Sequence, residues 1–159
     1  MEFREIVRKK KALSEDECVG ILKSELRGVL SVIGDGGYPY GMPLNHFYDE
    51  RDGHLYFHSG PTGHKIDAIK ACDKASYCVY DGGFRREGEW ALNICSVIVF
   101  GRMHIVEDRA KALDMVRRLG LKYYPNAEDV EKEMQQAADR VLCLELTPEH
   151  ITGKIVNES

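Results

Sequence analysis

A chain of 159 residues with 43% hydrophobic and 30% charged residues suits one soluble domain, so we predict a single domain over residues 1–159. Its net charge of −4 argues against nucleic-acid binding, which needs a concentrated basic face. No apolar run approaches the roughly 20 residues of a membrane span, and the polar start Met-Glu-Phe-Arg-Glu is unlike a signal peptide. We therefore expect a cytoplasmic protein with no membrane partner, and the basic run Lys9-Lys10-Lys11 should be a solvated arm.

The cysteines and histidines give no metal signature. Five cysteines without a C-x-x-C pair are expected to be reduced and mostly buried. Among six histidines, only His54 and His58 share one face of a predicted strand, and neither belongs to a zinc-binding motif. No metal site is predicted, and His46 and His104 are expected to face solvent from strands.

The N-terminal half is predicted to contain one helix and three strands. Ser14 and Glu17 have the spacing of a capping box, and apolar residues follow at helical intervals. The strands are expected at residues 29–33, 38–48 and 54–59.

The second of these strands carries two prolines. Gly34-Asp35-Gly36-Gly37 tolerates positive φ and should turn the chain back into a hairpin. Because Pro39 and Pro43 have no N–H group to donate to a ladder, the strand should be bulged or lie at a sheet edge. Its backbone would then keep carbonyl and amide groups free for another partner.

An anion-binding loop is predicted over residues 59–65, where the third strand ends and a helix begins. Unpaired N–H groups and the dipole at the helix start favour negative charge. Ser59 and Thr62 add hydroxyl groups and His64 and Lys65 add cationic ones, so a phosphate monoester would fit. The spacing is not that of a P-loop, which disfavours a nucleoside triphosphate. The alternative is an ordinary surface connection with solvated basic residues.

The C-terminal half is predicted to be strand-rich around two helices. Strands are expected at residues 75–80, 94–106, 141–147 and 151–156. A glycine-rich loop at 82–88 is expected to connect the first two of these strands, and Gly101 is expected to form a bulge in the second. Asp108 caps the first helix, and Pro125 and Asn126 separate it from the second. Six or so mostly adjacent strands with helices outside them predict an α+β fold, a small and mainly antiparallel β-barrel with peripheral helices, rather than a doubly wound parallel sheet.

Four segments also carry a family pattern. In chain order they are Gly37-Tyr38-Pro39-Tyr40 with Pro43-Leu44-Asn45, Phe57-His58-Ser59 leading to Gly63-His64-Lys65-Ile66-Asp67-Ala68-Ile69, Ser96-Val97-Ile98-Val99-Phe100-Gly101, and Glu149-His150-Ile151-Thr152-Gly153-Lys154. Together they resemble the pyridoxamine 5′-phosphate oxidase-like flavin proteins, most closely the nitroimidazole-resistance (Nim) branch. The resemblance covers nearly the whole chain and implies a split β-barrel homodimer with FMN at the subunit interface.

The resemblance further implies which residues contact the flavin. The edge of the flavin ring would meet the backbone of Met42, Pro43, Leu44 and Asn45. The ribityl phosphate would be held by His58, Ser59, His64 and Lys65. Ser96 would reach the flavin from the other subunit. These assignments agree with the predicted anion-binding loop and with the proline-interrupted strand.

Two departures from the family pattern bear on function. The residues after Ile151 lack the arginine-rich segment that grips the substrate phosphate in true pyridoxamine phosphate oxidases, so oxidation of vitamin B6 is not expected. His64 stands where those oxidases have an arginine. Because a histidine loses its charge near neutral pH, FMN is expected to bind less tightly above it.

Two classes of function remain open. The first is an oxidoreductase in which reduced FMN passes electrons to a small-molecule acceptor such as a nitroaromatic or a quinone, with His58 as the candidate catalytic residue. Trp90 could stack on the flavin or pack over the barrel end. The second is a flavin-binding protein without turnover, used for redox buffering or sensing. A deazaflavin could replace FMN, haem-degrading relatives share the fold, and no dinucleotide fingerprint marks a nicotinamide site.

Overall fold

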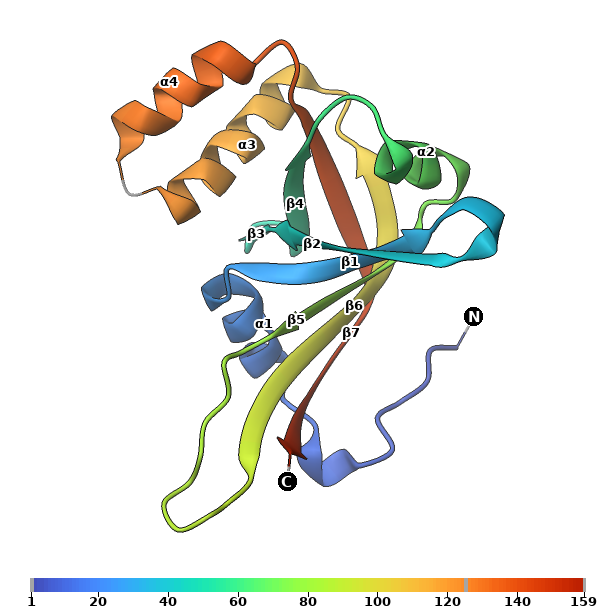
Figure 1. Ribbon diagram of the computed structural model, residues 1–159, viewed down its shortest axis with the longest axis vertical. Helices are drawn as coiled ribbons and strands as arrows, with labels where there is room; N and C mark the ends of the chain where they lie inside the picture. The colour runs from blue at the N-terminus through green and yellow to red at the C-terminus, as the bar shows by residue number, and fades with distance from the viewer. Residues whose placement is uncertain (1, 125, 159) are drawn as a thin grey trace.

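The computed structural model of the chain is a single curled sheet flanked by helices (Figure 1). It describes residues 2–124 and 126–158, so Pro125 of the predicted helix break lies outside the described residues, as do residues 1 and 159. The described part contains the helices Glu15–Ser24 (α1), His64–Ala71 (α2), Arg109–Tyr123 (α3) and Ala127–Ala137 (α4). Its strands are Arg27–Ile33 (β1), Pro39–Asn45 (β2), Phe47–Asp49 (β3), His54–Ser59 (β4), Lys74–Tyr80 (β5), Leu92–Ile105 (β6) and Leu142–Glu158 (β7).

The seven strands form one antiparallel sheet in the order β2-β1-β5-β6-β7-β4-β3. The predicted α+β fold, a mainly antiparallel split barrel with peripheral helices, is confirmed. The two edge strands, β2 and β3, are consecutive in the chain and only His46 separates them. The sheet therefore curls until its two edges meet at one residue, and the strand predicted at 38–48 is split at that point (Figure 1).

Strands β6 and β7 are the longest strands of the barrel and pair with each other. Phe100 pairs with His150 but Gly101 pairs with Pro148, so Glu149 is an extra residue and the bulge predicted at Gly101 is confirmed. A Cβ atom at Gly101 would lie 2.2 Å from the Thr147 carbonyl oxygen, which explains the glycine. Because the chain stays paired through the bulge, the two strands predicted at 141–147 and 151–156 are one continuous strand.

The inside of the barrel is filled with apolar side chains. Leu30, Phe57 and Tyr77 are fully buried there, and Leu22 of α1 and Ile66 of α2 cover the two open sides. Each such side chain contributes about 1.5–3 kcal/mol by leaving water. Because the interior is filled, a ligand must bind at the edges or the outer face of the sheet, not inside it.

The predicted capping box of α1 is confirmed, because Glu17 N–H donates to Ser14 Oγ at 3.2 Å and Ser14 N–H donates to Glu17 at 2.7 Å.

The outer face of the sheet is apolar and partly bare. Side chains alternate along each strand, and those pointing outward include Ile33 of β1, Tyr80 of β5 and Phe100 of β6, which are 46%, 56% and 41% exposed. The N-terminal arm, residues 2–11, crosses the β6–β7 part of this face (Figure 1). Within this arm Lys9 and Lys10 are exposed as expected, but Lys11 is half-buried. In the described part of the chain, no helix has the length and apolar character needed to cross a membrane.

His46, at the junction of the two sheet edges, is fully buried, so the prediction that it faces solvent is wrong, whereas His104 is exposed as predicted. Its Nε2 atom lies 2.7 Å from the Leu22 carbonyl of α1, and its Nδ1 atom lies 2.8 Å from the Tyr77 hydroxyl of β5. Its backbone N–H donates to the Tyr123 hydroxyl of α3 at 3.1 Å. One residue thus joins both sheet edges to a helix on each side and to the central sheet.

The His46 junction should make stability depend on pH. Burial, then the nearby Lys122 ammonium, lowers the pKa of His46 from 6.5 to about 4. The unfolded chain therefore takes up a proton before the folded one as the pH falls. The stability from the neutral ring is complete above about pH 6.5 and is lost between that pH and about pH 4, by about 3 kcal/mol.

We predict that His46→Gln removes this component. The difference in free energy of unfolding between the wild type and His46→Gln, measured by urea denaturation, should shrink as the pH falls from about 6.5 to about 4. His104→Gln, at the exposed histidine of β6, is the control and should keep the wild-type profile. Parallel profiles for the wild type and His46→Gln would contradict the buried neutral histidine.

Candidate functional site

The segment predicted to bind an anion forms the connection between β4 and α2. Gly63 precedes the helix with φ of 122°, a conformation that favours glycine, and no side chain caps the helix start. The N–H groups of Ile66 and Asp67 donate to the Gly63 carbonyl, but the described residues offer no acceptor for those of His64 and Lys65. Two backbone donors at the positive end of a helix are therefore available to an anion.

Two side chains add charge and polarity to the loop. Lys65 is half-buried, and burial lowers the pKa of its ammonium group. His58, at the end of β4, lies close enough to this ammonium that burial first, and Lys65 second, lower the pKa of the imidazole. In the described part of the chain no carboxylate forms a salt bridge with Lys65. A bound anion would therefore restore the electrostatic stabilisation that Lys65 loses by burial.

His64 links the loop to the edge strand. Its ring stacks on the ring of Tyr40 in β2, with centroids 4.2 Å apart and an interplanar angle of 17°. Its Nε2 atom accepts a hydrogen bond from the Asp35 N–H at 3.1 Å. Only Nδ1 is then left to donate to an anion. The sequence did not indicate this contact, which places the start of α2 beside β2.

The predicted position of the proline strand is confirmed, since β2 is an edge of the sheet. Gly34 N–H donates to the Tyr38 carbonyl across the hairpin at 2.8 Å. The backbone N–H and C=O groups point to alternate sides along a strand. Those of the even-numbered residues of β2 point toward β1, and those of the odd-numbered residues point away from the sheet edge. Pro39 and Pro43 therefore lie where a missing N–H costs no ladder hydrogen bond.

This alternation sorts the predicted flavin-edge residues into two pairs. Met42 and Leu44 direct their backbone groups toward β1, and the Leu44 carbonyl oxygen also lies 2.8 Å from the Tyr77 hydroxyl oxygen. Pro43 and Asn45 direct theirs outward. The free edge next to the loop thus offers carbonyl acceptors from both residues and an N–H donor from Asn45.

Ser96 lies apart from the loop within one subunit. It points to the outer face of β6, between its cross-strand partners Tyr80 and Lys154. Ile105, at the end of β6 nearest to the loop, is nine positions further along the strand, which corresponds to about 30 Å of strand length. The structure therefore brings together His58, Ser59, His64 and Lys65 with the β2 edge, but not Ser96.

A second polar cluster lies at the other end of β4. The carboxylate of Glu145 is 2.6 Å from His54 Nδ1, and it also accepts hydrogen bonds from Tyr56 and from the Lys111 ammonium at 3.1–3.2 Å. Asp52 completes a group whose ligand atoms lie within 4.8 Å of one another. Lys111 already supplies a cation there. Its members are up to 93 residues apart in the chain, so no sequence spacing could have indicated this cluster.

Trp90, the aromatic residue beside the glycine-rich loop, is 86% exposed. Of the two alternatives for Trp90, packing over the barrel end is therefore not observed, and its ring is free to contact another molecule. It lies between β5 and β6 in the long hairpin that extends away from the barrel (Figure 1).

Solved structures share this fold. A proposed 5-nitroimidazole antibiotic resistance protein from Bacteroides thetaiotaomicron has a TM-score of 0.78 at 18% identity, over 92% of this chain and 87% of its own. An FAD-binding protein from Mesorhizobium loti has a TM-score of 0.66 at 25% identity, over 92% and 97%. An FAD- and haem-binding protein from Mycobacterium smegmatis has a TM-score of 0.72 at 18% identity, over 92% and 73%.

No curated protein sequence matches the chain. A family model described as pyridoxamine 5′-phosphate oxidase matches residues 14–155, a range that includes the anion-binding loop, the β2 edge and Ser96. The motifs that carry the sequence resemblance all lie inside this range. The chain therefore belongs to the pyridoxamine 5′-phosphate oxidase family.

Proposed function

We propose that the protein is an FMN-binding oxidoreductase that passes electrons from reduced flavin to a small organic acceptor such as a nitroaromatic or a quinone. One observation carries the proposal. The stacked rings of Tyr40 and His64 hold the anion-binding loop beside the free edge of β2. A flavin mononucleotide has matching parts, a phosphate and a hydrogen-bonding ring edge joined by a short polyol.

The phosphate would bind at the start of α2. Lys65 supplies a charge without an acidic partner in the described part of the chain, and the N–H groups of His64 and Lys65 supply backbone donors. Ser59 and His58 complete the loop from the end of β4. FAD-binding relatives share the fold, and the same loop would accept the FMN half of FAD.

The ring edge would bind along β2. The pyrimidine part of a flavin has one N–H donor flanked by two carbonyl acceptors. The Asn45 N–H can donate to one of these carbonyl groups, and an outward carbonyl of Pro43 or Asn45 can accept from the flavin N–H. Arg27 Nε donates to Asn45 Oδ1 at 2.9 Å, which fixes this end of the strand.

The site would be completed by a second copy of the chain. The outer face leaves Ile33, Tyr80 and Phe100 exposed, an apolar surface of the kind that a homodimer covers. Since Ser96 lies on this face, nine positions along β6 from the strand end nearest to the loop of its own subunit, it would meet the flavin held by the partner.

The residues around the proposed flavin suit electron or hydride transfer. Bound flavin supplies the redox chemistry, and the described residues of the loop contain no nucleophile–base pair. His58 is the candidate to move a proton, because its lowered pKa favours the neutral ring. Residues 142–158 contain no arginine and pair along β6, so we do not propose vitamin B6 oxidation.

We predict that Lys65→Glu weakens FMN binding by at least 100-fold, on the order of 3 kcal/mol, because it replaces a charge-assisted contact with repulsion. Flavin fluorescence titration measures the affinity, and circular dichroism checks the fold. Lys70→Glu, on the exposed far end of the same helix, makes the same charge change and should bind FMN as the wild type does. Equal affinities for both variants would place the phosphate elsewhere.

We also predict that the chemically reduced protein is reoxidised by a nitroaromatic or a quinone without oxygen. Stopped-flow absorbance of the flavin should show reoxidation at least 10-fold faster than that of free reduced FMN, with stoichiometric reduced product. Reoxidation no faster than free FMN across a panel of acceptors would instead support a flavin-binding protein without turnover.

A further inference from the structure

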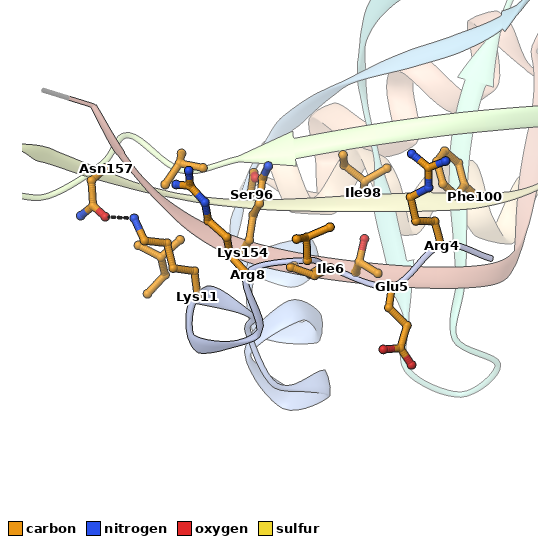
Figure 2. A pocket seen from close by; sticks show the side chains of 15 residues that line it. Arg4, Glu5, Ile6, Arg8, Lys11, Ser96, Ile98, Phe100, Lys154 and Asn157 are labelled. Atoms are coloured by element: carbon orange, nitrogen blue, oxygen red, sulfur yellow. Dashed lines mark hydrogen bonds between the residues drawn. The ribbon is translucent and has the colours of Figure 1, made fainter.

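The N-terminal arm encloses a cavity of about 590 Å³ against β6 and β7, which we call the arm pocket. Figure 2 shows arm side chains on one side of it and side chains of the two strands on the other. Ile6, Ile98 and Phe100 give the pocket apolar walls, and Ser96 adds a hydroxyl group. A volume of this size would accept a small organic molecule.

The arm pocket is strongly cationic in an acidic protein. Four basic side chains line it: Arg4, Arg8, Lys11 and Lys154. The acidic side chain that also lines it, Glu5, pairs with Lys9 at 3.2 Å instead. Among the side chains that the structure describes, no carboxylate lies within salt-bridge distance of Arg4, Arg8 or Lys154. Such a concentration of unpaired positive charge favours an anionic ligand.

Several contacts hold the arm in place over the strands. Leu13 N–H donates to the Gly153 carbonyl at 2.8 Å, and Ala12 forms a bridge with Lys154. Near the other end, the ring of Phe3 stacks on His150 with centroids 4.8 Å apart and an interplanar angle of 3°. Lys11 donates to the Asn157 side chain (Figure 2). The pocket is therefore built from a docked segment anchored on both sides of its basic residues.

We propose that the arm pocket binds a small organic anion with an apolar or aromatic body, and that this anion is the electron acceptor. The guanidinium groups of Arg4 and Arg8 suit a carboxylate or a phosphate ester, which they can grip through two parallel hydrogen bonds. Ile98 and Phe100 would contact the body of the molecule. The role as acceptor rests on the proposed function, because Ser96, on the wall of the pocket, is the residue proposed to meet the partner's flavin. Anion binding itself does not rest on it.

Binding is tested first, without reference to flavin. Isothermal titration of 4-nitrobenzoate into the protein as isolated should show saturable binding that is weakened by added salt. The double variant Arg4→Gln/Arg8→Gln should lose at least 10-fold in affinity. Lys10→Gln also removes one arm charge but lies outside the pocket, and it should bind as the wild type does. No saturable binding, or equal affinity in the wild type and the double variant, overturns the proposal.

The role as acceptor is tested by comparing three nitroaromatics in flavin reoxidation: 4-nitrobenzoate, 4-nitrophenyl phosphate and the neutral 4-nitrobenzyl alcohol. The wild type should have a KM for its preferred anion at least 10-fold below that for the alcohol, and the double variant should lose this preference with the KM for the alcohol unchanged. The preferred anion identifies a carboxylate or a phosphate ligand. Fast reoxidation without any preference for an anion overturns the role of the pocket in acceptor binding but leaves the proposed function intact. Anion binding by a protein that takes up no flavin overturns the proposed function but leaves anion binding in the arm pocket intact.

Discussion

The barrel depends on one buried residue at the point where its two edges meet. Strands β2 and β3 close the curled sheet without pairing to each other in the described structure, so the closure relies on His46 and its partners. An unpaired sheet edge is otherwise free to shift or to open. The ring of His46 binds α1 and β5, while Lys122 of α3 donates to its backbone carbonyl at 3.1 Å. This junction fixes the position of β2, and with it the free edge on which the proposed ring site stands.

A cofactor can therefore bind only at the surface of the sheet. The filled interior leaves no room for a cofactor, whereas the edge of β2, the start of α2 and the outer face each keep polar or apolar groups unpaired. Two of these regions carry positive charge that the described structure does not neutralise, around Lys65 and around the N-terminal arm. Lys65 lies at the start of α2, whereas the arm lies along β6 and β7. A dimer that brings the arm of one subunit to the loop of its partner would place an electron donor and an anionic acceptor side by side.

The sequence indicated the features that depend on near neighbours. The capping box at Ser14, the hairpin before β2, the edge prolines and the bulge at Gly101 each follow from residues a few positions apart. The features it did not indicate depend on distant ones. His46 was expected to face solvent from the strand predicted at 38–48, yet its ring partners are 24 and 31 residues away. The arm pocket likewise joins residues near the start of the chain to β7, and no local pattern connects the two.

We propose that two copies of this chain together hold FMN between the predicted anion-binding loop of one and the outer face of the other. Size-exclusion chromatography with light scattering, followed by mass spectrometry of the cofactor released from the peak, tests it most directly. We expect a yellow dimer that releases FMN at about one molecule per subunit. A colourless protein that takes up no added FMN, or a monomer that retains flavin, would contradict it.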